Sequence, residues 1–509
     1  MDKPFRPLFI GLYDAKLLGI RYLSSTLKAH GYDPQLIFLK NFNSHKAEEP
    51  TAAEYELLIN KVLELNPAYI GISIMCSFYL PVAKHIALEL KKRANNLIIL
   101  GGVYPTLFPK ECLEFADVVF MGEAEGAIVD FTRAFEAGLP YDDIDNLAIK
   151  LQGGEKLVNP VRPYLQDLDT LPHPDFGGGN IYYINNDKLT NTDPEAHSFS
   201  YEMTTSRGCP NHCSFCSNAN LRKIYAGKGK SIRQRGVDDV FAEIAEVKKI
   251  NKGLQLIRFW DEIFPWDLKW VEEFAIRYKR EVKIPFEIWG NPLLSAGPHI
   301  KMLKDAGLSK IVIGIQSGCP KIRKDVYLRE ETQEEIIKCS QVLADAKVPI
   351  VIYDFILGHP FESTEDLRNT LELCRCLKKP FRLQLHGLSF LPGTKIEEIA
   401  VERGVKTWEE IRAEQSKPLK EQYHENHWWR RGHNDEQDAE KTFWYTLIFL
   451  TQFMAGGLII KHALKKEKNK NNPSFLVFIR SIFNYWLLFK VGMRKLIFMI
   501  KNKARRFVR

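Results

Sequence analysis

The sequence is poor in cysteine and shows no secretory signal at its start. Only nine of its 509 residues are cysteine, which argues against a disulfide framework in a chain of this length. The first residues do not follow the charged and then apolar pattern of a signal peptide. Both features favour the reducing cytosol as the location of the protein.

Acidic residues are almost missing from the C-terminal part. Residues 461–509 contain fourteen lysines and arginines against one acid, Glu467, so this part carries a net charge of +13. The whole chain carries +8, which leaves −5 on the first 460 residues. The body of the protein therefore lacks the basic excess of a nucleic-acid-binding protein, and we expect no nucleic-acid partner.

Three of the cysteines are gathered in one short stretch. Cys209, Cys213 and Cys216 follow a strand-like run and are separated by three and two residues. Three thiolates leave a tetrahedral zinc ion without its fourth ligand, whereas soft thiolates also select iron–sulfur clusters. A [4Fe-4S] cluster held by three cysteines keeps one iron open, which favours catalysis over electron storage. A structural zinc loop and unrelated cysteines are the alternatives.

This spacing, with Phe215 directly before the last cysteine, resembles the signature of the radical S-adenosylmethionine (SAM) enzymes. The resemblance implies that Cys209, Cys213 and Cys216 hold the cluster, that its open iron binds SAM, and that Phe215 lies at the SAM site. Reductive cleavage of SAM would yield a 5′-deoxyadenosyl radical. The resemblance also implies a reductant such as flavodoxin or ferredoxin.

The first 150 residues alternate between strand-like and helix-like segments. Strand-like runs lie at 9–13, 35–39, 69–74, 97–100 and 117–121, and helical spacing lies at 17–29, 53–65 and 82–93. The alternation predicts an α/β domain with a doubly wound parallel sheet over residues 1–150. Ligands of such sheets bind beyond the carboxyl ends of the strands.

This half resembles the cobalamin-binding domain that precedes many radical SAM cores. Asp14, Lys16 and Gly19 are in register with its D-x-H-x-x-G motif, with lysine in the histidine position. A protonated lysine is a poor cobalt ligand, so we expect a corrinoid with no protein histidine below the cobalt. Further contacts are implied at Ser73, Gly101, Gly102, Gly122 and Glu123. A domain that has lost its cofactor and only supports the next one is the alternative.

Residues 151–198 are rich in proline, glycine and acids, and we interpret them as a linker. Strand and helix alternate again over 199–405. The strand candidates are 203–205, 256–260, 287–290, 310–314, 350–356 and 383–390. Six such repeats suit the partial (β/α)6 barrel that the resemblance implies, with the chemistry at the strand carboxyl ends.

Polar residues at these strand ends are candidate contacts of SAM or the substrate. They are Asp261, Glu262, Gln316, Ser317, Asp354 and Gly358. The resemblance places the first pair near the SAM amino group or the substrate, although a helix N-cap explains two adjacent acids equally well. The second pair could hydrogen-bond the ribose or carboxylate of SAM. The third belongs to a stretch that resembles the family's turn beside the adenine.

Four further cysteines fall in the barrel region. Cys319 follows a strand-end turn and is a candidate catalytic residue near the expected cavity. Cys339 lies on an apolar helix face and is expected in the core. Cys374 and Cys376 face different sides of a helix, so we expect no shared metal.

Residues 406–509 lose the alternation and are expected to be helical. The uncharged run 442–460 reaches the lower part of the membrane-span range, but we favour a buried helix packed on the barrel. A second helix after residue 473 places basic residues beside an apolar face, which suits peripheral contact with an anionic membrane. The face consists of Phe475, Ile479, Ile482, Phe483, Trp486 and Phe489. A helix docked on the body with a solvated basic end is the alternative.

Together these features predict a cobalamin-dependent radical SAM enzyme with a [4Fe-4S] cluster, SAM and cobalamin as cofactors. The resemblance favours methyl transfer to an unactivated carbon of a small molecule, and the aromatic tail slightly favours a hydrophobic substrate. A radical SAM oxidoreductase or cyclase without functional cobalamin is the main alternative. A non-catalytic iron–sulfur carrier or sensor is a weaker one, because it would need neither the barrel nor its strand-end turns.

Overall fold

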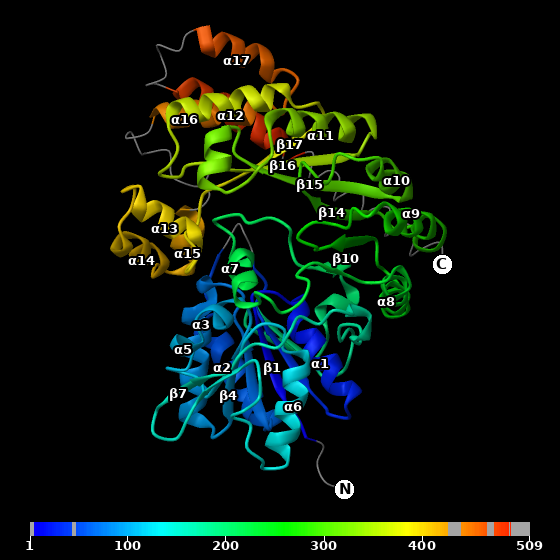
Figure 1. Ribbon diagram of the computed structural model, residues 1–509, viewed down its shortest axis with the longest axis vertical. Coiled ribbons are helices and arrows are strands. Elements are labelled where there is room, and N and C mark those ends of the chain that lie inside the picture. Colours follow the sequence, from blue (N-terminus) through cyan, green and yellow to red (C-terminus); the bar gives the residue numbers. More distant parts are fainter. Residues whose placement is uncertain (1–4, 43–46, 426–438, 466–472, 488, 490–509) are drawn as a thin grey trace.

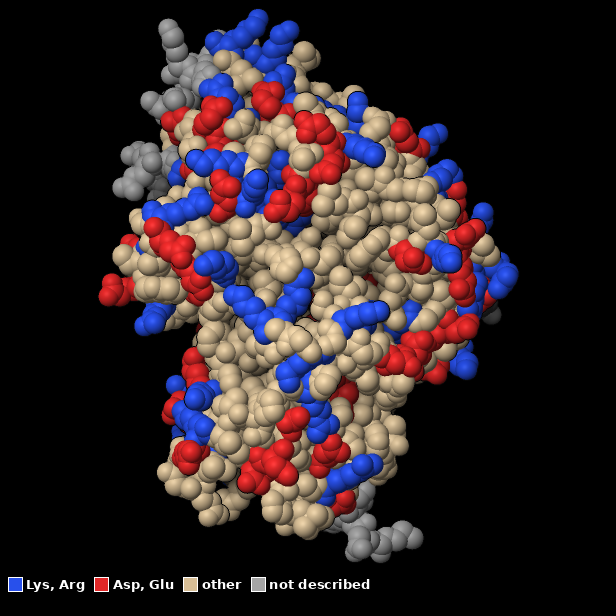
Figure 2. Space-filling model, viewed as in Figure 1, with Lys and Arg blue, Asp and Glu red and all other residues tan. Residues whose placement is uncertain are grey.

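The computed structural model describes residues 5–42, 47–425, 439–465, 473–487 and 489. Two sheets follow one another along the long axis of the molecule, and the C-terminal helices lie beside and beyond the second sheet (Figure 1). The first sheet is blue and cyan in this view, and the second is green. On the face shown in Figure 2, acidic and basic side chains are interspersed, as expected for a body that carries little net charge.

Nine strands form the first sheet, in the order β7-β6-β5-β4-β3-β1-β2-β8-β9. The parallel strands of the predicted doubly wound unit are β1 (Leu8–Leu12), β2 (Gln35–Leu39), β3 (Tyr69–Ser73), β4 (Leu97–Gly101) and β5 (Val118–Phe120). Every residue of β1, β2 and β3 is buried, because helices cover both faces of the sheet.

The helices of this unit pack on the two faces of its sheet. On one face, Leu27 and Phe131 share a core with Phe38 of β2. The helices that carry these residues, α1 (Leu18–Ala29) and α6 (Glu125–Glu136), also contact each other. The remaining helices are α2 (Ala52–Leu65), α3 (Leu80–Arg93), α4 (Val103–Leu107) and α5 (Pro109–Cys112). Leu58 of α2 and Ile86 of α3 belong to the core on the opposite face.

The linker expected over 151–198 differs from the prediction, because part of it joins the first sheet. The strands of the expected linker are β7 (Lys156–Val158), β8 (Ile181–Asn185) and β9 (Lys188–Thr190), and β6 (Leu147–Lys150), which precedes it, pairs with β5 and β7. β8 pairs parallel with β2, and β9 returns antiparallel to β8. The run 181–184 is β-branched and aromatic, and Asn186 and Asp187 have the positive φ angles of a tight hairpin turn. The surrounding prolines and glycines obscured this hairpin in the sequence.

Six parallel strands form the second sheet, in the order β10-β13-β14-β15-β16-β17. They are β10 (Ser200–Met203), β13 (Leu256–Phe259), β14 (Phe286–Gly290), β15 (Leu308–Gln316), β16 (Ile350–Ile356) and β17 (Arg382–His386). Among the described residues the end strands β10 and β17 are not paired with each other, so the barrel is partial. The predicted fold class is therefore confirmed.

Helices connect the strands of the partial barrel. They are α8 (Val237–Ile250), α9 (Leu268–Arg277), α10 (His299–Ala306), α11 (Gln333–Asp345) and α12 (Thr364–Cys376). Between β10 and α8 lie a two-stranded ribbon, β11 (Ser206–Arg207) with β12 (Arg233–Gln234), and helix α7 (Ser217–Ile224). The three cysteines of the predicted cluster site lie on the loop from β11 to α7.

The C-terminal region is helical, as expected. Its helices are α14 (Trp408–Gln415), α15 (Leu419–Glu425), α16 (Ala439–Leu450) and α17 (Gly456–Lys465), and α13 (Lys395–Glu402) precedes it at the end of the barrel region. The uncharged run 442–460 is divided between α16 and α17, and α16 packs against α12 of the barrel. None of the described helices is long and apolar enough to cross a membrane.

The helix over residues 474–487 divides the expected apolar face in two. Ile479 and Phe483 pack on the barrel core, whereas Phe475 and Ile482 are exposed. The helix is therefore docked on the body and also presents apolar side chains to solvent. The basic residues expected at its end, from Lys490 to Arg509, lie outside the described residues.

Trp444 tests the packing of α16 on α12 of the barrel. Its side chain is 0% exposed, and the Arg368 guanidinium of α12 lies 4.9 Å from its ring. Replacing a buried tryptophan by alanine costs about 3–5 kcal/mol. We expect Trp444→Ala to speed amide exchange in α12 and α16 by about 100-fold or more. Met454→Ala, at a position that is 83% exposed, is the control and should leave the exchange unchanged. Equal exchange in both variants would contradict the packing described.

Candidate functional site

One cavity of about 450 Å³ lies between the carboxyl ends of the two sheets. We call it the interdomain cavity. Its first wall consists of residues of the first domain, among them Gly19 at the start of α1 and the strand-end residues Ser73, Gly101, Gly102, Gly122 and Glu123. Its second wall includes Arg207, Cys209, Asn218, Arg222, Trp260 and Glu262. Six of the eight predicted cobalamin contacts therefore share one cavity with one of the predicted cluster ligands.

The backbone conformation requires glycine at two positions of the first wall and does not require it at two others. Gly102 and Gly122 have φ angles of +110° and +68°, which favour glycine on backbone grounds alone. At Gly101 an added Cβ would come no nearer than 3.9 Å to another atom, and at Gly19 it would meet nothing within 4 Å. Protein packing does not require glycine at these two positions. Their smallness leaves room in the cavity, as the close approach of a large planar ligand requires.

Asp14 and Lys16 turn away from the cavity. The Lys16 Nζ lies 2.6 Å from the Glu202 Oε1 on β10 of the barrel, and the Asp14 Oδ1 accepts a hydrogen bond from the backbone N–H of Lys16 at 2.9 Å. Burial raises the pKa of Asp14 above its usual value. Neither residue lines the interdomain cavity. The lysine in the histidine position therefore joins the first sheet to the barrel.

The cluster loop, residues 208–216, runs from β11 to α7. Gly208 has a φ angle of +98°, and a Cβ there would lie 2.1 Å from the Ser231 carbonyl oxygen, so only glycine fits beside the ribbon. The Arg222 Nη1 of α7 donates to the Cys209 carbonyl oxygen at 3.0 Å. Cys216 is the N-cap residue of α7. Backbone contacts thus fold the loop back onto the helix that follows it.

The far end of the cluster loop is tied to the barrel. The Ser214 hydroxyl donates to the Val326 carbonyl oxygen at 2.5 Å, and its backbone N–H donates to the Tyr327 carbonyl oxygen at 3.1 Å. Phe215 packs edge-on against Tyr327, with 5.1 Å between ring centroids. Phe215 therefore anchors the loop in a core of the barrel, which is a structural use of the predicted aromatic position.

The thiols of the loop lie in a setting that suits a cationic centre. Burial raises the pKa of Cys216 to about 11 and also raises that of Cys209, and neighbouring cysteines add to both shifts. The Arg329 Nη1 lies 3.4 Å from the Cys213 Sγ, so a positive charge stands beside the loop. The loop residues thus fit an iron–sulfur cluster, in which each of three irons takes one thiolate and offsets its charge.

Within the part of the chain that the structure describes, no three histidine, cysteine or acidic side chains surround one common point.

The two predicted acids after β13 separate into different roles. Glu262 lines the cavity and accepts a hydrogen bond from Asn218 at 3.3 Å. Asp261 is 2% exposed, and its Oδ1 accepts hydrogen bonds from Thr205 and Ser206. Burial raises the pKa of Asp261 to about 7. Asp261 therefore holds the start of the ribbon and does not line the cavity, and the N-cap of α9 is Asp267.

The remaining predicted SAM contacts lie along β15 and β16. Gln316 has a φ angle of +72°, and Ser317 is fully buried with its hydroxyl accepting from the Cys319 N–H. Asp354 stands beside Gly314 in the strand pairing, and burial raises its pKa to about 7. The Gly358 N–H donates to the Glu362 Oε2 at 3.1 Å. None of these residues lines the interdomain cavity, and Ser317 shapes the turn.

The cysteines outside the loop lie mainly in cores. Cys319 packs with apolar residues of the barrel, and burial raises its pKa. Cys339 and Cys374 are buried in the main barrel core, as expected for Cys339. Cys376 is exposed, so it does not share an environment with Cys374.

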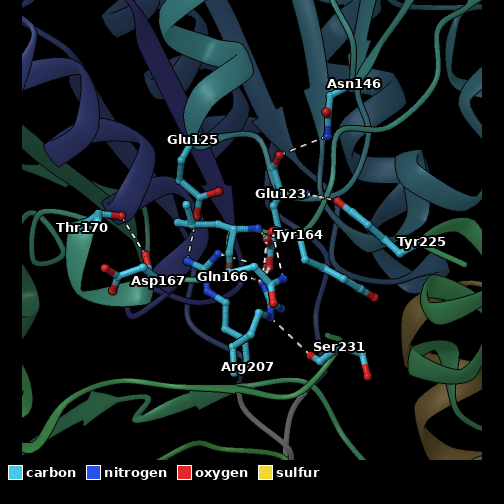
Figure 3. Close-up of polar contacts among 12 residues, drawn as sticks. Glu123, Glu125, Asn146, Tyr164, Gln166, Asp167, Thr170, Arg207, Tyr225 and Ser231 are labelled. Carbon is cyan, nitrogen blue, oxygen red and sulfur yellow. Dashed lines mark hydrogen bonds and ion pairs between the residues drawn. The ribbon is translucent and has the colours of Figure 1, made fainter. Parts of the chain in front are cut away.

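A cluster of charges beside the cavity was missed in the sequence. Glu123 and Glu125 follow β5 and lie beside Arg207 of β11 (Figure 3), and Glu123 also pairs with Arg233 of β12. Burial raises the pKa of Glu125, but the Arg207 guanidinium outweighs this and holds the value below its usual range. Arg207 directly precedes the cluster loop, and this adjacency was the available signal. The partner acids lie more than eighty residues away, where no local pattern reveals them.

Two family models match separate parts of the chain. The model described as the radical SAM superfamily matches residues 203–374. The model described as the B12 binding domain matches residues 12–132. The first match contains the cluster loop and four strands of the partial barrel, and the second contains the strand ends of the first sheet.

Two curated relatives match over most of this chain. An uncharacterized methyltransferase, PH0819, of Pyrococcus horikoshii is 25% identical over 75% of this chain and 78% of its own length. The anaerobic magnesium-protoporphyrin IX monomethyl ester cyclase of Rubrivivax gelatinosus is 23% identical over 70% of this chain and 61% of its own length.

The fold also matches a solved structure along nearly the whole chain. The cobalamin-dependent SAM radical enzyme OxsB, with aqua-cobalamin and SAM bound, superposes with a TM-score of 0.65 at 14% identity. The match covers 97% of this chain and 80% of that one. This chain therefore has the fold of that enzyme, with a B12-binding domain over residues 12–132 and a radical SAM domain over residues 203–374. The chain belongs to the radical SAM enzymes that carry an N-terminal B12-binding domain.

Proposed function

We propose that the enzyme transfers a methyl group to an unactivated carbon of a small molecule. When bound and reduced, the cluster would cleave one SAM to methionine and a 5′-deoxyadenosyl radical, and cobalamin would pass on the methyl group of a second SAM, which would be released as S-adenosylhomocysteine. We assign the B12-binding domain to residues 1–150, the linker to 151–198, the radical SAM barrel to 199–405 and the helical region to 406–509. In this division β8 and β9 of the linker complete the first sheet.

The interdomain cavity is the observation that carries the proposal. It has open glycine positions on one wall, at Gly19 and Gly101, and Cys209 of the cluster loop on the other. A corrinoid on the first wall and SAM on the second would face each other. Such an arrangement suits transfer between two cofactors and one substrate. An empty supporting domain has no need of open glycine positions that face the cluster loop.

Residues of this chain would hold and shield the reactants. Cys209, Cys213 and Cys216 would bind the cluster, and Arg329 beside Cys213 would offset its negative charge. Glu262, which lines the cavity, would accept hydrogen bonds from the SAM amino group. The walls would keep water away from the reacting carbon.

Trp260 supports a hydrophobic or planar substrate. Its ring lines the cavity, is 45% exposed and stacks on Trp289 with 4.0 Å between centroids. An exposed ring that a neighbour holds in place is a ready surface for an apolar group. A small flavodoxin or ferredoxin would supply the electrons.

The rival function is that of a radical SAM cyclase or oxidoreductase. The relative from Rubrivivax gelatinosus is named as a cyclase, and the same cavity could hold its kind of reaction. Methyl transfer and cyclisation differ in the fate of SAM, since only the first consumes its methyl group.

Anaerobic enzyme with reconstituted cluster and added hydroxocobalamin tests the proposal. With methyl-labelled SAM, dithionite and a deproteinised anaerobic cell extract, we expect bound corrinoid, 5′-deoxyadenosine, S-adenosylhomocysteine and label in a small molecule. The Cys213→Ala variant should lose the cluster absorbance and all 5′-deoxyadenosine. Deoxyadenosine without S-adenosylhomocysteine would favour the cyclase or oxidoreductase.

Gly101→Val and Lys16→Ala form a matched pair that tests whether the first wall of the interdomain cavity binds the corrinoid. A valine at residue 101 would reduce the space of the cavity that this residue lines, and its Cβ would come no nearer than 3.9 Å to another protein atom. We expect Gly101→Val to weaken corrinoid retention about tenfold or more. Lys16→Ala should retain the corrinoid, since Lys16 pairs with Glu202. The opposite pattern, measured by visible absorbance after gel filtration, would assign the contact to Lys16.

We also propose that the C-terminal helix contacts an anionic membrane surface. Phe475, Phe478, Ile482, Tyr485 and Phe489 recur at spacings of three and four residues and are 53–73% exposed, so they form one apolar stripe. The sequence that follows is basic up to Arg509. Apolar side chains beside positive charge suit binding to the interface of anionic lipids.

A triple variant, Phe475→Ser, Phe478→Ser and Tyr485→Ser, tests the membrane contact by vesicle flotation. The wild type should float with phosphatidylglycerol vesicles and be released by salt, and the variant should bind about tenfold or more weakly. Ile276→Ser, at a position that is 58% exposed on α9, is the control. Equal flotation of variant and wild type would refute the contact. Flotation with neutral phosphatidylcholine vesicles would refute the role of charge.

A further inference from the structure

The two strands of the small ribbon beside the cluster loop carry one arginine each. Arg207 of β11 and Arg233 of β12 are directly paired across the ribbon, so both side chains leave the same face of the ribbon. Arg207 contacts Glu123 and Glu125, the acidic pair that follows β5 of the first sheet (Figure 3), and Arg233 contacts Glu123. We call these four residues, Glu123, Glu125, Arg207 and Arg233, the arginine clamp.

The contacts within the clamp are short and interlocked. The Arg233 Nη1 donates to both carboxylate oxygens of Glu123, at 2.6 and 2.8 Å. The Arg207 Nη2 donates to the Glu125 Oε1 at 2.7 Å, and its Nη1 lies 3.5 Å from the Glu123 Oε1. The Arg233 side chain is 4% exposed. Because a guanidinium group is planar and rigid, such contacts restrict orientation as well as distance.

Aromatic rings hold the clamp from both domains. The Arg233 guanidinium lies 4.4 Å from the Tyr164 ring, and Tyr164 stacks on Tyr225 with 3.9 Å between centroids. The Tyr225 hydroxyl in turn accepts a hydrogen bond from the backbone N–H of Glu123 at 2.7 Å. Arg207 lies 5.3 Å from the Tyr22 ring of α1. The junction is therefore specified by stacking and hydrogen bonds as well as by charge.

The clamp lies at one end of the cluster loop. Arg207 stands two residues before Cys209, so the near end of the loop is held by the B12-binding domain. The far end is held by the barrel, through Ser214 and its contacts with Val326 and Tyr327. The loop is thus suspended between the two domains and not carried by the barrel alone.

We propose that the arginine clamp is a positioning device that sets the separation between the cluster loop and the first wall of the interdomain cavity, where the corrinoid would bind. The proposal rests on the proposed function, because it assigns to the clamp the control of the distance between the two bound cofactors. Cleavage of SAM requires only the cluster loop and the barrel. Delivery of the methyl group requires both walls at a fixed distance. Weakening the clamp should therefore impair delivery more than cleavage.

Other contacts keep the domains together when the clamp is weakened. The Lys16–Glu202 ion pair joins the first sheet to β10. Buried Arg21 of α1 pairs with Asp193 at 2.8 Å, next to the start of the barrel. A clamp variant should consequently remain a folded, two-domain protein with altered registry.

Glu125→Gln and Arg207→Lys test the proposal in the full-length apoprotein. Glutamine keeps the size of the glutamate, and lysine keeps the charge of the arginine but loses its fork. We expect amide exchange over residues 207–213 to rise about tenfold, with no change in the main barrel core. Asp130→Asn is the matched control, because it removes the acid of the more exposed Arg162–Asp130 pair. Exchange unchanged in both clamp variants would overturn the proposal.

The holoenzyme supplies a second readout. With the cluster reduced and the cobalamin in its paramagnetic Co(II) form, the dipolar coupling between the two centres reports their separation. We expect a broadened or shifted distance distribution in Glu125→Gln. We also expect 5′-deoxyadenosine within about twofold of the wild type, while S-adenosylhomocysteine falls about tenfold or more. Equal losses of both products, or an unaltered distance, would overturn the positioning role.

The two proposals fail in different ways. If the wild type binds no corrinoid, the proposed methyl transfer fails, while amide exchange still decides whether the clamp holds the cluster loop. If the wild type transfers methyl groups and the clamp variants do so equally well, only the clamp proposal fails.

Discussion

The arginine clamp determines how the two halves of the molecule meet. In this clamp Glu123 and Glu125, which follow β5 of the first sheet, form ion pairs with Arg207 and Arg233 of the ribbon. Each half is a parallel sheet with its functional edge at the carboxyl ends of the strands. Two such edges enclose a cavity only when they face each other at a defined distance. The guanidinium groups restrict both the distance and the angle, and they do so beside the loop that carries Cys209.

Buried charge at the junction of the domains serves assembly, whereas glycines and Trp260 in the walls of the cavity leave space and an exposed ring for ligands. Lys16 pairs with Glu202, and Asp261 holds Thr205 and Ser206 at the start of the ribbon. Ionic groups removed from water need partners, and here each partner comes from another element. The wall residues Gly19, Gly101 and Trp260 remain available for ligands. Such an arrangement suits an enzyme in which large cofactors carry out the chemistry and the protein holds them in position.

Much of the fold and part of the site could be predicted from the sequence. The cluster loop is readable because its three cysteines lie within eight residues, so their proximity does not depend on the fold. The strands of both sheets follow from their apolar runs, and the cavity glycines follow from their places at strand ends. The β8–β9 hairpin was missed because prolines and glycines surround it. The direction of Lys16 was missed because Glu202 lies 186 residues away.

The sequence by itself determined the local elements: two series of alternating strands and helices, a three-cysteine loop, a lysine in place of a histidine, and a basic tail. Each depends on residues close together in the chain, where spacing and residue type suffice. Tertiary structure alone decided that Arg207 and Arg233 meet Glu123 and Glu125, that Asp261 turns inward while Glu262 faces the cavity, and that the tail helix is docked on one side only. Those outcomes depend on which surfaces face each other after folding, and contacts between distant segments leave no periodic signal in one sequence.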